Sequence, residues 1–128
     1  MDEEFFKLQI RNASVELMSE IAKLDSIYDK LISRLLLNPK LSQTKIPKNE
    51  LAAISEYVVN ISNACAKIMT ILNEAEKYGV NIEVPITRTI CVNTVSLMCV
   101  RYDLDRLLLV KAMIAETLKE LVKHVEEG

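Results

Sequence analysis

The stretch Thr89–Val110, TICVNTVSLMCVRYDLDRLLLV, is the most apolar window of this 128-residue chain and the one on which its predicted fold depends. Its apolar spacing continues toward the C-terminus, which predicts one long helix over residues 86–127. The main stripe of that helix recurs at steps of three and four residues, with Lys111 as its one polar interruption. It comprises Leu97, Val100, Leu104, Leu107, Ile114, Leu118, Leu121 and Val125.

A second apolar stripe accompanies the first. At about 100° per helical residue, positions 95 and 97 place the two stripes roughly 160° apart. A helix in a three-helix bundle meets its neighbours on adjacent faces, so the second stripe would be an exposed patch, which small soluble proteins avoid. We therefore expect it to form the interface of a homodimer. The predicted interface residues are Val92, Val95, Cys99, Tyr102, Arg106, Leu109 and Met113.

Two alternatives to this interface remain open. A bend or break in an earlier helix would give a four-helix monomer that covers the second stripe. Thr89–Val100 is also rich in β-branched residues, as buried strands are. Arg106 either pairs with an acid across the interface and fixes its register, or belongs to helix-surface pairs such as Arg101 with Asp105 and Asp103 with Arg106.

Two earlier helices are predicted over residues 3–37 and 48–78, each with a coiled-coil-like heptad pattern. Asn38-Pro39 ends the first, because a residue before proline is pushed out of the helical region. Gly79 is expected to be the left-handed residue after the second. The heptad positions are Ile10, Ser14, Leu17, Ile21, Leu24, Tyr28, Leu31 and Leu35, followed by Leu51, Ile54, Val58, Ile61, Cys65, Ile68, Leu72 and Ala75.

The short connections predict a single all-α domain, an up-down-up bundle of three long helices completed by dimerisation. The first and third helices would then be parallel. Val80–Pro85 alternates apolar and polar residues, so we expect an extended link that packs on the end of the bundle. The loop after the first helix would lie where the third helix ends, near His124.

Composition favours a cytoplasmic protein without a membrane segment. The net charge is −2, the N-terminal residues are acidic, and no run approaches the roughly 18 apolar residues that a membrane span requires. The three cysteines, Cys65, Cys91 and Cys99, show no CxxC spacing, so we expect thiols used as small core residues. An intermolecular disulfide is the alternative.

Catalytic, metal and cofactor chemistry is not indicated. The single histidine, His124, lies near a helix end, where a solvated cation is typical. Two acidic pairs, Glu16 with Glu20 and Asp25 with Asp29, flank the heptad stripe as solvated edges. With two glycines in the chain, a glycine-rich phosphate loop is excluded. We therefore expect a protein that is not an enzyme and has no cofactor or metal.

One segment carries basic residues without acids. This segment is the loop of residues 38–48, together with Arg34 just before it. Its candidate phosphate contacts are Arg34, Lys40, Lys45 and Lys48. No aromatic residue lies among them for base stacking. The sequence thus favours a self-associating interaction or structural subunit. The alternative is a nucleic-acid-associated accessory protein that uses the basic loop.

Overall fold

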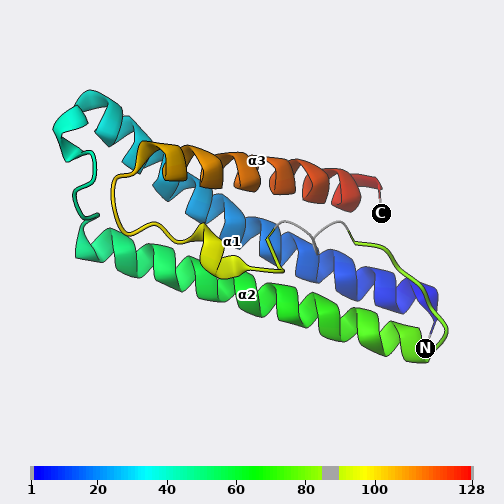
Figure 1. The fold of residues 1–128 in the computed structure, drawn as a ribbon. Coiled ribbons are helices and arrows are strands. Elements are labelled where there is room, and N and C mark those ends of the chain that lie inside the picture. The colour runs from blue at the N-terminus through cyan, green and yellow to red at the C-terminus, as the bar shows by residue number, and fades with distance from the viewer. Residues whose placement is uncertain (1, 85–89, 128) are drawn as a thin grey trace.

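The computed structural model describes residues 2–84 and 90–127 of the chain. Its elements are α1 (Glu3–Leu37), α2 (Lys48–Lys77) and α3 (Leu104–Glu127), with short 3-10 turns η1 (Pro39–Leu41) and η2 (Thr94–Leu97), as Figure 1 shows. The predicted all-helical bundle is confirmed, with no named strand in the described ranges.

Local chemistry sets the ends of the first two helices. Asp2 accepts a hydrogen bond of 2.9 Å from the backbone N–H of Phe5 at the start of α1, where side-chain caps are favoured. Gly79, with φ +73°, follows α2 as predicted. The N–H of Gly79 donates to Glu76 and that of Val80 to Ala75, which is the Schellman arrangement.

α1 and α2 form an antiparallel pair whose heptad positions line the core. All eight heptad positions of α1 are buried, and those of α2 are buried or half-buried. Polar contacts fix the direction of the pair, because Arg34 near the end of α1 meets Glu50 near the start of α2. Glu16 reaches Lys67 at 3.1 Å toward the opposite end.

The helix predicted over residues 86–127 begins only at Leu104, so the prediction is wrong for residues 90–103. Residues 86–89 lie outside the described part, and residues 90–103 are irregular apart from η2. Asp103 stops the helix from extending backward, because its carboxylate accepts the N–H of Arg106 at 3.2 Å, the geometry of an N-cap. The β-branched residues of this segment also have weak helix propensity. The stripe of residues 92–113 is therefore not one helical face.

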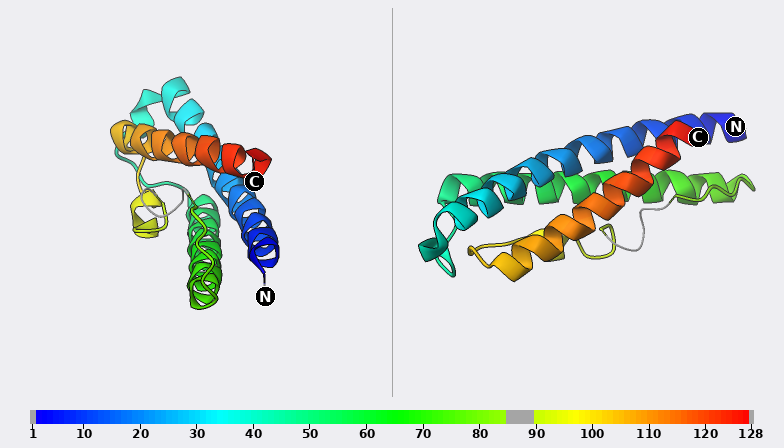
Figure 2. Two further views of the ribbon diagram at one scale, coloured as in Figure 1. Left: turned by 90° about the vertical axis from the view of Figure 1, so that its right-hand side faces the viewer. Right: turned by 90° about the horizontal axis from the view of Figure 1, so that it is seen from above.

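α3 runs antiparallel to α1, so the expected parallel arrangement is wrong. Lys111 contacts Asp25, and His124 near the end of α3 shares a cavity with Lys7 near the start of α1. Both termini lie at the same end of the bundle (Figure 2). The reason is the long link after α2: its described residues 90–103 return along the bundle, so that α3 starts near the end of α1 (Figure 1).

The link ends beside the loop between α1 and α2. The N–H of Ile46 donates to Val100 at 3.0 Å, and Gln43 and Thr44 exchange hydrogen bonds with the backbone of Tyr102. The basic loop consequently lies at the start of α3, not near His124 as expected.

An ion cluster fixes how α1 and α3 pair. Lys111 lies within 2.6 Å of Asp25 and 2.7 Å of Asp29. Burial alone would lower the pKa of Lys111, but the hydrogen bonds that its ammonium donates to both aspartates outweigh this effect and raise the pKa above its usual value. Asp25 and Asp29, expected as solvated edges, thus contact α3.

Replacing Lys111 with methionine is expected to lower the free energy of unfolding at pH 7 by about 1–2 kcal/mol, because two neighbouring carboxylates lose their counter-charge at a half-buried site. A lysine with a raised native pKa stabilises the fold below its unfolded pKa, and this contribution is lost as pH rises through the native pKa. Urea denaturation should therefore show the wild-type advantage undiminished at pH 9 and shrinking only above about pH 10.5. An advantage that disappears between pH 7 and 9 would contradict this cause.

Ser14 occupies a core position of α1, and its hydroxyl finds no hydrogen-bond partner among the described residues. Ser14→Ala is expected to raise the free energy of unfolding by about 1 kcal/mol, because it removes a buried unpaired polar group. Ser19→Ala, at an exposed position of the same helix, controls for helix propensity. An equal gain in both variants would show that burial of the hydroxyl has no part in the effect.

The cysteines differ from the expectation of three free thiols. Cys65 in α2 and Cys91 in the link form an intrachain disulfide with 5.6 Å between their Cα atoms. Cys99 is free and buried. The disulfide attaches the link to α2. No helix in the described ranges is long and apolar enough to cross a membrane.

Candidate functional site

The link is anchored in the core by its 3-10 turn. Leu97 is fully buried, and its carbonyl accepts a hydrogen bond from the hydroxyl of Tyr28. Cys99 and Tyr102 are 4% and 1% exposed. These two predicted interface residues therefore belong to the chain's own core.

Three other predicted interface residues are open to solvent. Val92, Val95 and Leu109 are 74%, 72% and 53% exposed, whereas Met113 is half-buried against the core. Arg106 donates a hydrogen bond from its guanidinium to the carbonyl of Ser96, so η2 is held against the first turn of α3. We call Val92, Val95, Arg106 and Leu109 the link–α3 surface.

Arg106 therefore has a role within the chain that the sequence did not predict. It joins the link to α3 instead of forming the expected ion pair with Asp103, whose carboxylate caps its backbone N–H. Val92 before η2, Val95 within it and Leu109 of α3 are each exposed, and the Arg106–Ser96 contact joins the two segments that carry them. The apolar surface is composed of two segments, which no single helical pattern can represent.

Two buried polar groups of the core are held in their neutral forms. Burial raises the pKa of Tyr28 far above its usual range, and nearby Cys99 adds to the effect. Burial also raises the pKa of the Cys99 thiol, an increase that hydrogen bonds with Tyr28 and Arg106 only reduce. Because the thiolate is the reactive form of cysteine, burial and the raised pKa both lower the reactivity of Cys99.

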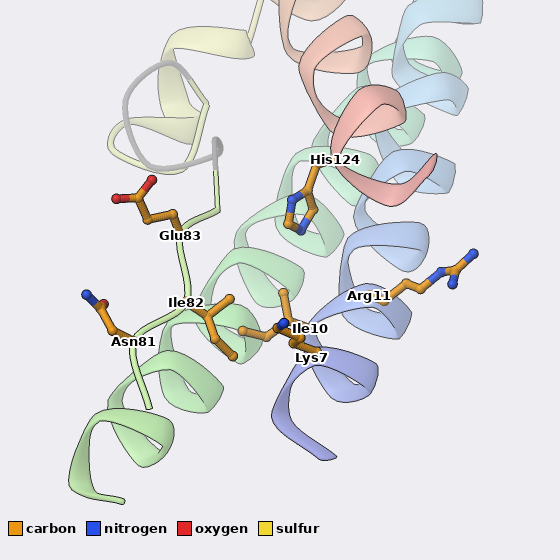
Figure 3. A pocket seen from close by; sticks show the side chains of 7 residues that line it. All are labelled: Lys7, Ile10, Arg11, Asn81, Ile82, Glu83 and His124. Carbon is orange, nitrogen blue, oxygen red and sulfur yellow. The ribbon is translucent and has the colours of Figure 1, made fainter. Parts of the chain in front are cut away.

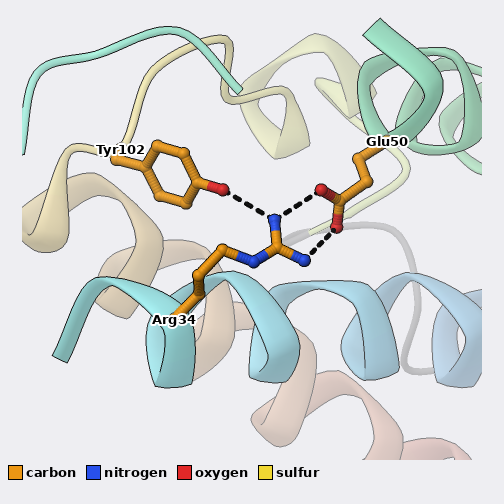
Figure 4. A network of polar contacts seen from close by, with 3 residues as sticks. All are labelled: Arg34, Glu50 and Tyr102. Carbon is orange, nitrogen blue, oxygen red and sulfur yellow. Dashed lines mark hydrogen bonds and ion pairs between the residues drawn. The ribbon is translucent and has the colours of Figure 1, made fainter. Parts of the chain in front are cut away.

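Arg34 is engaged in a network at the end where the basic loop lies (Figure 4). Its guanidinium donates to both carboxylate oxygens of Glu50, at 2.5 and 3.1 Å, and to the hydroxyl of Tyr102 at 2.7 Å. Glu50, and then Tyr102, raise the pKa of Arg34. Bidentate pairing of this kind fixes a guanidinium firmly, so Arg34 joins α1, α2 and the link.

The remaining basic residues of the loop are exposed. Lys40, Lys45 and Lys48 all face solvent. An isolated antiparallel bridge places Arg101 of the link beside Lys45, and the Arg101 guanidinium donates to the carbonyl of Gln43 at 2.8 Å. The three exposed lysines of the loop are therefore joined by Arg101, which is distant in the sequence.

The acidic pairs of α1 serve helix contacts. Glu20 accepts a hydrogen bond of 3.1 Å from Asn60 of α2 and also pairs with Lys23. Burial would raise the pKa of Glu20, but Lys23 and Asn60 together lower it. Across the described residues, no group of three or more His, Cys, Asp or Glu side chains is placed to hold a metal ion.

Comparison of the chain with protein-family models, curated proteins and solved structures finds no match. Any functional conclusion therefore depends on the surfaces and cavities of this chain alone.

Proposed function

We propose that this chain is a non-enzymatic, self-associating subunit whose second copy binds to the link–α3 surface. The observation that carries the proposal is the exposure of Val92, Val95 and Leu109, at 74%, 72% and 53%. Burying large aliphatic side chains removes apolar area from water, at roughly 25 cal/mol per Å². A twofold axis through this surface would bury these side chains on both copies of the chain.

The construction of the surface supports a docking role. Its two valines come from a segment fixed to α2 by a disulfide and to α1 through Leu97. A surface that is ordered before binding loses little conformational entropy when a partner arrives. Arg106 is half-buried, which leaves the apolar side chains as the exposed feature.

Val95→Glu is expected to convert a dimer into a monomer of 14.5 kDa at micromolar concentration, because it would bury an unpaired charge in the interface. Light scattering coupled to size exclusion measures the mass. Val59→Glu is the matched control, since Val59 is 54% exposed on α2 outside the link–α3 surface. A wild-type monomer, or equal dissociation in both variants, would contradict the proposal.

A second candidate function has one specific observation in its favour. Arg101 joins the exposed Lys40, Lys45 and Lys48 at one end of the bundle, a cluster able to contact nucleic-acid phosphates. Each phosphate contact makes the binding affinity fall more steeply as the salt concentration rises. Lys45→Gln should then weaken binding to duplex DNA. It should also reduce the slope of log affinity against log salt concentration by about one, as gel shifts across a salt series would show. Lys77→Gln, at the other end of α2, should change neither.

A further inference from the structure

A cavity of about 300 Å³ lies at the end of the bundle that holds both termini. It is formed where the first turns of α1, the residues just after α2 and the last turn of α3 meet (Figure 3). Its lining residues are Lys7, Ile10, Arg11, Asn81, Ile82, Glu83 and His124.

The side chains of the cavity divide into two sets. Figure 3 shows His124 and Ile82 directed toward Ile10 and Lys7, which together surround the interior. Arg11 and Glu83 are directed outward at the rim. The interior thus combines two hydrogen-bond donors, Lys7 and His124, with two branched aliphatic side chains.

The charge of the interior favours an anion. Lys7 carries a positive charge, and the His124 ring can donate a hydrogen bond. Lys7 also lies 3.3 Å from Glu3 and 4.0 Å from Glu4, but all three side chains are largely exposed. Exposed helix pairs of this kind are weak, so the ammonium can turn toward a ligand at little cost.

We propose that this cavity binds a small organic carboxylate. The carboxylate lies between Lys7 and His124, and the hydrocarbon part packs against Ile10 and Ile82. Ligand sites typically combine an apolar lining with a few polar groups, and a volume near 300 Å³ is at the small end of their range. The proposal concerns the end of the bundle and does not depend on self-association.

Proton NMR of the wild-type protein tests the site without assignment, because His124 is the only histidine of the chain. Titration with octanoate at fixed pH is expected to shift the His124 ring resonances to saturation. Acetate should bind at least about tenfold more weakly because it lacks the chain that contacts the isoleucines. 1-Octanol, which has the chain without the charge, should produce no saturable shift.

Lys7→Gln is expected to weaken octanoate binding at least about fivefold, since a charge-assisted contact is lost. Lys77→Gln is the matched control, because Lys77 is also exposed and paired with a glutamate one turn away, yet lies outside the cavity. Equal responses to octanoate and octanol, or to octanoate and acetate, would overturn the proposal. So would unchanged affinity in Lys7→Gln.

Discussion

Leu97→Ala is expected to lower the free energy of unfolding by about 2–5 kcal/mol, the cost of removing a large side chain from a packed core. Leu97 is fully buried, with an exposed fraction of 0%, and it lies in η2. The loss would arise both from the apolar contacts of Leu97 and from the cavity that the truncation leaves. Urea denaturation followed by circular dichroism measures it.

Val95→Ala provides the matched control within the same 3-10 turn. Val95 is 72% exposed, so its truncation should change the stability of the monomer by less than about 0.5 kcal/mol. Comparison at concentrations low enough to dissociate any dimer keeps the two effects separate. Equal costs for the two truncations would mean that the link does not pack as the structure shows.

Reduction of the Cys65–Cys91 disulfide is expected to lower the free energy of unfolding by about 3 kcal/mol. The bridge joins residues 26 apart in sequence, and closing a loop of that length restricts the unfolded chain by about this amount. It is also the covalent attachment of the link to α2. Denaturation with and without a phosphine reductant gives the difference.

Cys91→Ser supplies the control for reduction. This variant should match the reduced wild-type protein in stability, and the reductant should have no further effect on it. Cys99 remains free and buried in both forms. A wild-type protein that is insensitive to reductant under denaturing conditions would show that the bridge does not form.

Periodicity predicted the first two helices closely because it reports one-sided burial. Every heptad position of α1 is buried, even Ser14, and the cap at Gly79 follows from its tolerance of positive φ. The same method failed for residues 90–103, where apolar residues are also common. An irregular segment packed between helices can be as apolar as a helix, so composition alone does not distinguish the two.

The error in α3 also reversed the predicted topology. Once Asp103 caps the helix, residues 90–103 become available to return along the bundle, and α3 then runs back toward the N-terminus. Asp103 was a signal that the sequence contained, since aspartate is a preferred N-cap. The disulfide and the contact of Lys111 with Asp25 depend on this topology, so spacing alone did not predict them.

The candidate sites were partly predicted. Val92, Val95 and Leu109 were selected as members of a helical stripe, and they are exposed for a different reason, as parts of two segments joined by Arg106. Arg34 was selected for its charge, but that charge is paired with Glu50. The cavity around Lys7 and His124 brings together residues from three distant parts of the chain, which no local pattern reveals.

Distances between spin labels test self-association through the link–α3 surface most directly. A single label at Glu116, two turns along α3 from Leu109 and exposed, is compared with one at Asn63, one turn from Val59 on α2, both in a Cys99→Ala background. A monomer with one label gives no dipolar signal. We predict a signal from both samples with the shorter distance at position 116; no signal from either, or the shorter distance at position 63, would contradict the proposed interface.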